Sequence, residues 1–128
     1  MIGIGVDLCG IERMEKNLEN TRFLEKFFTP EERRYIAGRG AAGAESAAAA
    51  FAAKEAFLKA LGIGISGGIR MDEIGVIHGE NGAPSYELKG AAAEKLRAAG
   101  AERALLSLTH ESGLACAFCV LEEGERRL

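Results

Sequence analysis

Two carboxylates and a lysine are the side chains of this 128-residue chain whose positions best suit chemistry on a phosphate group. Asp7 follows two glycines in an alternating segment, and Glu55 and Lys59 are four residues apart in the segment FAAKEAFLKALGIGI. Magnesium in proteins is commonly held by one or two carboxylates together with substrate phosphates, and lysine is a usual phosphate binder. Asp7 and Glu55 are therefore candidate ligands of one magnesium ion, with Lys59 as a candidate phosphate-binding residue.

Each of these residues also has an ordinary structural explanation. Residues four apart share a helix face, so Glu55 and Lys59 could form an exposed ion pair worth roughly 0.3–0.5 kcal/mol. Asp7 could close a turn or cap the helix that follows its strand. Lys54 lies on a different helix face from Lys59, so it is either a second phosphate-binding residue or an ordinary solvated lysine.

The histidines and cysteines are less specific. His110 ends a predicted strand, where it either bonds within the turn or serves as a ligand or acid-base group, because histidine titrates near neutral pH. His78 also ends a strand, and there the structural explanation is favoured. Cys116 and Cys119 have the spacing of a redox motif, but residues three apart in a strand point to opposite faces, so both are interpreted as core thiols.

Glu55 and Lys59 are carried by a predicted helix. The segment is rich in Ala, Leu, Lys and Glu, begins near residues 45–46, and is ended by Gly62. Gly62 and Gly64 begin a glycine-rich turn whose open backbone N–H groups let a bulky anionic ligand approach.

Asp7 is carried by a predicted half-buried strand. Glycine inside a strand often marks the close approach of a ligand or of another backbone, so Asp7 is expected to lie beside a space rather than inside packing. The alternation puts Ile2, Ile4, Val6 and Leu8 on one face and Gly3, Gly5 and Asp7 on the other.

The rest of the chain completes an α+β pattern. A helical stretch over residues 11–27, broken near 20–21, precedes a helix over 30–37 that Thr29 and Glu32 begin as a capping box. Residues 38–43 are predicted to be a loop. Predicted strands 74–78 and 85–88 form a hairpin, a helix follows over 90–99, and strands 105–109 and 114–121 form a second hairpin.

Length and composition are those of one globular domain, spanning residues 1–128. No apolar run approaches the roughly 20 residues of a membrane span, and the N-terminus lacks the features of a signal peptide. We therefore expect a cytoplasmic location and no membrane partner. The net charge of −3 argues against a nucleic-acid partner, because such proteins normally carry a basic surface.

Three segments together resemble one family, the holo-acyl-carrier-protein synthases, which are the small bacterial type of 4'-phosphopantetheinyl transferase. The segments are GIGVDLCGIERM at 3–14, FAAKEAFLKALGIGI at 51–65 and SLTHESGLACAFCV at 107–120, and FTPEE at 28–32 and NGAP at 81–84 occur in the family's order. The resemblance spans nearly the whole chain.

The resemblance implies transfer of the phosphopantetheine arm from coenzyme A to a serine of apo acyl-carrier protein, releasing adenosine 3',5'-bisphosphate, in fatty acid biosynthesis. The family's magnesium ligands fall on Asp7 and Glu55, and its motif lysine falls on Lys59, a candidate to stabilise charge on the pyrophosphate. Lys54 and His110 match positions near coenzyme A. The group that takes the serine proton is either Glu55, directly or through a water, or His110.

The resemblance also implies partners. The family forms trimers with active sites between neighbouring subunits, and Asp7 and Glu55 are expected on different sides of that seam. An isolated monomer would then lack a complete site. The carrier protein is expected to be acidic and to dock on basic residues of the first helical stretch: Arg13, Lys16, Arg22 and Lys26.

Three positions depart from the family pattern. Ala50 stands where arginine is common, Ile63 replaces the usual threonine, and Leu58 stands where a small or polar residue is frequent. We expect weaker or rearranged contacts with coenzyme A rather than lost activity. The alternative is a non-catalytic module of the same fold that binds coenzyme A or a nucleotide, and Ala50 is its motivation.

Overall fold

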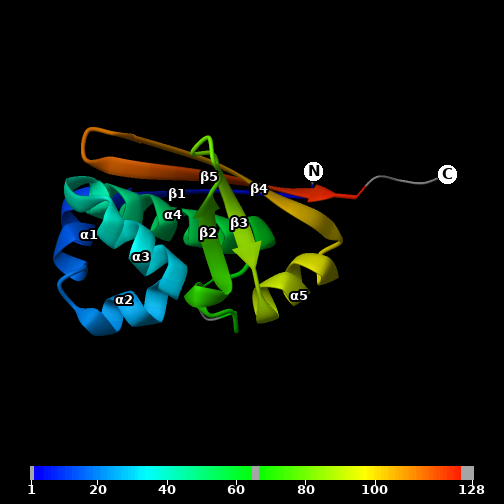
Figure 1. Cartoon of the computed structure of the whole chain (residues 1–128). Coiled ribbons are helices and arrows are strands. Elements are labelled where there is room, and N and C mark those ends of the chain that lie inside the picture. The colour runs from blue at the N-terminus through cyan, green and yellow to red at the C-terminus, as the bar shows by residue number, and fades with distance from the viewer. Residues whose placement is uncertain (1, 65–66, 125–128) are drawn as a thin grey trace.

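A layer of antiparallel strands lies along one side of the molecule, and the helices lie beneath it (Figure 1). The computed structural model describes residues 2–64 and 67–124. The layer is a three-stranded sheet with the order β1-β5-β4, in which β1 spans Gly3–Gly10, β4 spans Ala101–Glu111 and β5 spans Leu114–Glu123. Asp7 pairs with Ala117 of β5, so it lies inside β1 rather than at its end.

The long helix α4, Gly43–Leu61, packs on one face of this sheet and carries both Glu55 and Lys59. It begins two residues earlier than expected and ends as expected at Gly62, which has φ 77° and closes the helix in the left-handed conformation. Residues 40–42 of the expected loop form a short 3-10 helix that leads into α4.

The remaining elements confirm the α+β pattern. The expected break in the first helical stretch separates α1, Ile11–Asn17, from α2, Thr21–Phe27, and the Asn20 side chain caps α2. Thr29 and Glu32 form the expected capping box of α3, Pro30–Gly38. A second two-stranded sheet joins β2, Ile74–His78, to β3, Pro84–Leu88; the 3-10 helix η2, Met71–Glu73, precedes it, and α5, Gly90–Ala98, follows.

The glycine face of β1 is covered by the backbone of α4. A methyl group built on Gly5 would overlap the carbonyl oxygen of Ala56, and one on Gly3 would overlap that of Ala60. The glycines therefore mark the close approach of another backbone, which is the second of the two possibilities that the sequence left open. This contact brings β1 near enough to α4 for Asp7 to meet the side chains of that helix.

Replacing Gly5 by alanine is expected to destabilise the fold by about 1–3 kcal/mol, because the added methyl group must push a strand away from a helix. Thermal unfolding measures the effect. Gly38→Ala is the matched control: nothing lies within 4 Å of its added methyl group, so it should be neutral or slightly stabilising. Equal unfolding midpoints for the two variants would contradict this account of the packing.

The opposite face of the sheet is apolar and exposed. Figure 1 shows no described element over it. Val6 of β1 pairs with Phe118 of β5, and both are about half exposed, at 53% and 44%. The apolar face consists of the exposed residues Ile2, Ile4, Val6, Leu8, Leu105, Leu114 and Phe118. A contiguous exposed apolar surface of this kind marks an interaction site.

Candidate active site

Asp7, Glu55 and Lys59 come together where β1 crosses α4. The Lys59 ammonium group donates a hydrogen bond to Asp7 Oδ1 at 2.7 Å and another to the Val6 carbonyl oxygen at 3.1 Å. The Asp7 side chain is only 11% exposed, whereas that of Lys59 is 55% exposed. Lys59 therefore pairs across to the strand, and the simple i,i+4 ion pair with Glu55 is not its main contact.

The two carboxylates of this cluster repel one another. Partial burial raises the pKa of Glu55, and the neighbouring Asp7 carboxylate raises it further. The hydrogen bond with Asp7 raises the pKa of Lys59 and keeps that side chain charged. Two carboxylates held this close together form a negative centre that favours a bound cation.

The donor set fits magnesium. Among residues 2–64 and 67–124, no group of three His, Cys, Asp or Glu side chains is placed to hold a metal ion. Magnesium needs no such cage, because one or two carboxylates, several waters and the oxygens of a substrate phosphate usually complete its coordination. Asp7 and Glu55 would supply the carboxylates, and the Lys59 ammonium group beside them is exposed to an approaching phosphate.

Lys54 does not lie in this cluster. Its side chain is completely buried, and its ammonium group donates hydrogen bonds to Glu32 Oε1 and to the carbonyl oxygens of Met71 and Ile74. Burial lowers the pKa of Lys54, and the Glu32 carboxylate opposes that change. This placement speaks against a direct contact between Lys54 and coenzyme A, and it equally excludes an ordinary solvated lysine.

His110 lies in a separate hollow of about 260 Å³, at the other end of α4 from Lys59. Its Nε2 is 3.1 Å from Glu45 Oε1. The rings of Tyr35 and His78 stack nearby, with centroids 4.4 Å apart, and both line the hollow. His110 is also two strands from the position of Asp7 in the sheet, roughly 10 Å at the usual strand spacing. Within one chain, His110 is therefore not part of the carboxylate cluster.

Arg39 is a residue of this hollow that the sequence did not single out. Its Nε donates a hydrogen bond to Ser46 Oγ at 3.3 Å, and its guanidinium group lies 5.8 Å from the centre of the Tyr35 ring. Burial lowers the pKa of His78, and the charge of Arg39 lowers it further. The hollow thus combines a flat pair of rings with a permanent positive charge.

The glycines after α4 are exposed. Gly62 and Gly64 each have open space where a side chain would begin. Ile63 between them bonds back to the Leu58 carbonyl oxygen at 3.0 Å, so the turn is closed by the end of the helix. The two residues that follow Gly64 lie outside the described residues. The expected approach of a ligand to this turn stays a prediction.

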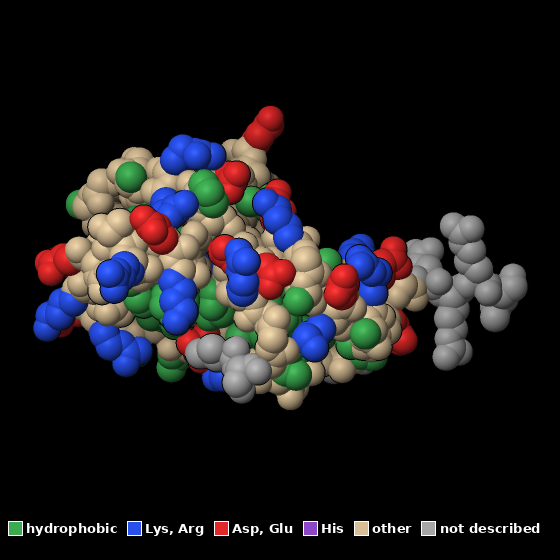
Figure 2. Space-filling model, turned by 90° about the horizontal axis from the view of Figure 1, so that it is seen from below, with side chains coloured by type: hydrophobic (Ala, Val, Ile, Leu, Met, Phe, Trp, Pro, Cys, Tyr) green, Lys and Arg blue, Asp and Glu red, His purple; other side chains and the backbone are tan. Residues whose placement is uncertain are grey.

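A larger hollow of about 600 Å³ lies between α2, the start of η2 and the Phe51 side of α4. Phe51, which lines the hollow, lies on α4 one turn before Glu55. Figure 2 views the molecule from below and shows Lys and Arg side chains around an apolar floor at the end where α1 and α2 lie. The hollow is lined by Glu25, Lys26, Phe27, Phe51, Ile69, Arg70, Met71 and Asp72.

One chain thus brings together Asp7, Glu55 and Lys59. The expectation that a seam between subunits separates Asp7 from Glu55 is wrong, because the packing of β1 on α4 joins them within a single chain. Any contribution of a neighbouring copy must come from other residues.

Within the described part of the chain, no helix has the length and apolar character needed to span a membrane.

The chain is similar to known proteins along nearly its whole length. A family model for the 4'-phosphopantetheinyl transferase superfamily matches residues 3–119. The holo-[acyl-carrier-protein] synthase of Treponema denticola is 41% identical over 122 residues, covering 95% of this chain and 98% of that protein.

Two solved structures are also similar. The crystal structure of the Neisseria meningitidis holo-[acyl-carrier-protein] synthase has a TM-score of 0.86 at 35% identity, covering 96% of this chain and all of that one. The Helicobacter pylori enzyme in complex with coenzyme A has a TM-score of 0.79 at 30% identity, covering 93% of this chain and 99% of that one.

Proposed function

This chain belongs to the 4'-phosphopantetheinyl transferase superfamily, and from that premise we propose how its residues transfer 4'-phosphopantetheine from coenzyme A to a serine of apo acyl-carrier protein. The observation that carries the proposal is the meeting of Asp7, Glu55 and Lys59 in one chain. The serine oxygen bonds to the β-phosphorus of the pyrophosphate, the bond from that phosphorus to the bridging oxygen breaks, and adenosine 3',5'-bisphosphate leaves.

Asp7 and Glu55 would hold a magnesium ion, which when bound draws negative charge from the pyrophosphate. Lys59 presents its exposed ammonium group to the leaving phosphate and offsets the charge that develops there. Glu55 takes the proton of the attacking serine, because its carboxylate lies in the cluster whereas His110 of the same chain lies in another hollow. Positioning and charge stabilisation are most of what phosphoryl transfer requires of a protein.

The hollow around His110 suits the nucleotide part of coenzyme A. Stacked rings such as those of Tyr35 and His78 offer a flat surface to a purine base. Arginine binds phosphate through several N–H groups at once, and Arg39 uses only one of its own on Ser46. Ala50, where the family often has arginine, is 94% buried in α4, so Arg39 takes over the basic contact that this position lacks.

Replacing Arg39 by alanine is expected to raise the KM for coenzyme A about tenfold with little change in kcat, since it removes binding to a part of the substrate that does not react. Steady-state kinetics with varied coenzyme A measures the change. Arg34→Ala is the control: Arg34 is an exposed arginine of α3, the helix that Arg39 follows, and it pairs with Glu31. An unchanged KM in Arg39→Ala would place the nucleotide elsewhere.

The carrier protein is proposed to dock at the end formed by α1 and α2. Arg13, Lys16, Arg22 and Lys26 are all exposed there. Lys26 lines the apolar hollow together with Phe51, which lies one turn before Glu55 on α4. An acidic carrier would meet these charges while its serine enters beside Phe51. Positive charge at this edge would speed the encounter with such a partner.

A homotrimer is proposed on the basis of the exposed apolar face. Val6 and Phe118 are placed to pack against a neighbouring copy, and β1, which carries Val6, also carries Asp7. Since the carboxylate cluster is complete in one chain, the neighbour's share is substrate binding rather than the magnesium ligands. The role in fatty acid biosynthesis and the cytoplasmic location expected from the sequence stay predictions.

The alternative is a module that binds coenzyme A without reacting. Release of adenosine 3',5'-bisphosphate distinguishes it from a transferase. A transferase releases one adenosine 3',5'-bisphosphate for each apo carrier protein supplied, and it stops when the carrier is consumed. A binding module releases none, and a hydrolase would release it without any carrier. The intact Asp7, Glu55 and Lys59 cluster favours the first outcome.

A further inference from the structure

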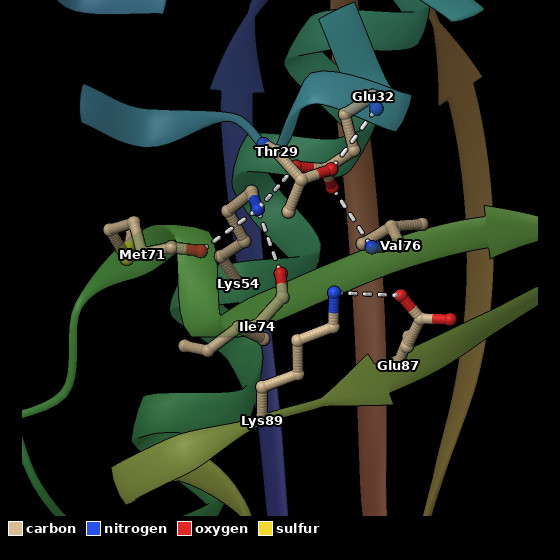
Figure 3. A network of polar contacts seen from close by, with 8 residues as sticks. All are labelled: Thr29, Glu32, Lys54, Met71, Ile74, Val76, Glu87 and Lys89. Carbon is tan, nitrogen blue, oxygen red and sulfur yellow. Dashed lines mark hydrogen bonds and ion pairs between the residues drawn. The ribbon is translucent and has the colours of Figure 1, made fainter. Parts of the chain in front are cut away.

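A buried ion pair lies behind the active site. Glu32 of α3 and Lys54 of α4 are 96% and fully buried, and their charged groups are 2.8 Å apart. Figure 3 shows the Lys54 side chain reaching from α4 towards Glu32, Met71 and Ile74, which belong to three other elements. Neither Glu32 nor Lys54 has a role in the transfer reaction proposed above.

Every donor of the lysine is used. The Glu32 carboxylate and the carbonyl oxygens of Met71 and Ile74, the latter two at 3.0 and 2.7 Å, each accept one hydrogen bond from Lys54 Nζ. Three acceptors require three N–H groups, so the structure holds Lys54 as an ammonium ion. Its charge also lies 5.7 Å from the centre of the Phe28 ring.

The carboxylate is equally occupied. Glu32 Oε1 also accepts from the Thr29 backbone N–H at 2.8 Å, and Oε2 accepts from the Val76 backbone N–H at 2.9 Å. One pair of side chains therefore joins the beginning of α3, the middle of α4, the beginning of η2 and the beginning of β2. A buried pair of this kind contributes little net stability compared with apolar residues, and in some proteins such pairs serve to fix one arrangement.

That arrangement bears on the rotation of α4. Successive residues of a helix are turned by 100°, so Glu55 projects about 100° round the helix from Lys54, and Lys59 lies on the same face as Glu55 one turn later. On another side, α4 is held by the close contact of Ala56 with Gly5. The Lys54 ammonium group, bonded to acceptors on α3, η2 and β2, is placed to oppose rotation of the helix about that contact.

We propose that Lys54 and Glu32 are positioning residues of the transferase, which set the rotation of α4 and so aim Glu55 and Lys59 at Asp7. The inference rests on the proposed function of that cluster. Neither side chain touches substrate. Their effect is on the geometry of the reacting groups, where a displacement of 1 Å can cost roughly a hundredfold in rate.

The test uses two variants in the full chain. Lys54→Met/Glu32→Gln removes both buried charges, so no ion is left unpaired, and Glu32→Gln alone removes the charge of the carboxylate and its bond from Val76. In each we expect kcat to fall at least tenfold and the KM for coenzyme A to stay within twofold. The control is Leu96→Ala, a core residue of α5 that is 93% buried and lies outside the network.

The thermal unfolding midpoint of each variant is measured beside the kinetics. A purely structural role predicts that kcat per folded molecule is unchanged in all three, whereas positioning predicts a loss only in the two network variants. A kcat within twofold of the original chain in the double variant, or in Glu32→Gln if the double variant does not fold, would overturn the proposal. Failure of the unaltered chain to transfer would instead refute the proposed function.

Discussion

Replacing Glu55 by glutamine is expected to lower kcat for phosphopantetheine transfer by about a thousandfold, which corresponds to several kcal/mol of lost transition-state stabilisation. The change removes one of the two carboxylates that would hold magnesium and the group that takes the serine proton. The fold should remain, because Glu55 is only partly buried and the amide has the same shape. The relevant measurement is the initial rate with saturating coenzyme A and carrier protein.

Two comparisons make this result specific. Glu94→Gln, at an exposed position of α5, should leave the rate unchanged. The unfolding midpoint of Glu55→Gln should equal or exceed that of the original chain, because neutralising Glu55 relieves its repulsion with Asp7. If Glu55→Gln kept more than a few per cent of the original chain's transfer rate, both roles assigned to Glu55 would be refuted.

Replacing Phe118 by aspartate is expected to convert the protein to monomers and to lower the transfer rate at least tenfold. In a trimer the new carboxylate would be buried at each interface, and the desolvation cost is several kcal/mol per ion. Light scattering during size-exclusion chromatography gives the molar mass, and the same fractions are assayed for transfer. Loss of activity follows if substrate-binding groups of a neighbouring copy complete the site.

Ile77→Asp is the matched control for this experiment. Ile77 is 40% exposed and Phe118 is 44% exposed, but Ile77 lies in the two-stranded sheet, away from the apolar face. It should leave both mass and rate unchanged. A fully active Phe118→Asp monomer would show that each chain works alone. If the unaltered protein is already monomeric, the apolar face is not a trimer interface.

The local structure was well predicted from the sequence because short-range rules govern it. The capping box of Thr29 and Glu32 and the glycine that ends α4 depend on residues within one turn of each other. The two hairpins and the fold class followed from alternation and turn residues. The meeting of Asp7 with Glu55 and Lys59 was expected from the family resemblance and from their chemistry, not from spacing.

What the sequence did not predict depends on which element covers which face. Alternation separated the two faces of β1, but it could not show that the glycine face would receive α4 while Val6 remained exposed. The prediction that a subunit seam separates Asp7 from Glu55 was wrong for the same reason. The resemblance described a trimer, and only the packing of β1 on α4 shows that one chain holds both carboxylates.

The sequence did not predict that Lys54 would be buried in an ion pair. A signal was present, because Lys54 lies four residues after Ala50 and three before Phe57, within the apolar stripe of α4. A lysine buried in such a stripe needs a buried acid as its partner, and the sequence had already indicated Glu32 as a capping residue. The sequence could not join them, since the pair spans 22 positions and two helices.

The most direct test of the central claim is the intact mass of an apo acyl-carrier protein after incubation with this protein, coenzyme A and magnesium, beside a sample with chelator. We predict a gain of one phosphopantetheine group that is absent under chelation and returns when magnesium is restored in excess. No gain with several carrier proteins, while the protein demonstrably binds coenzyme A, would contradict the account and favour a non-catalytic binding module.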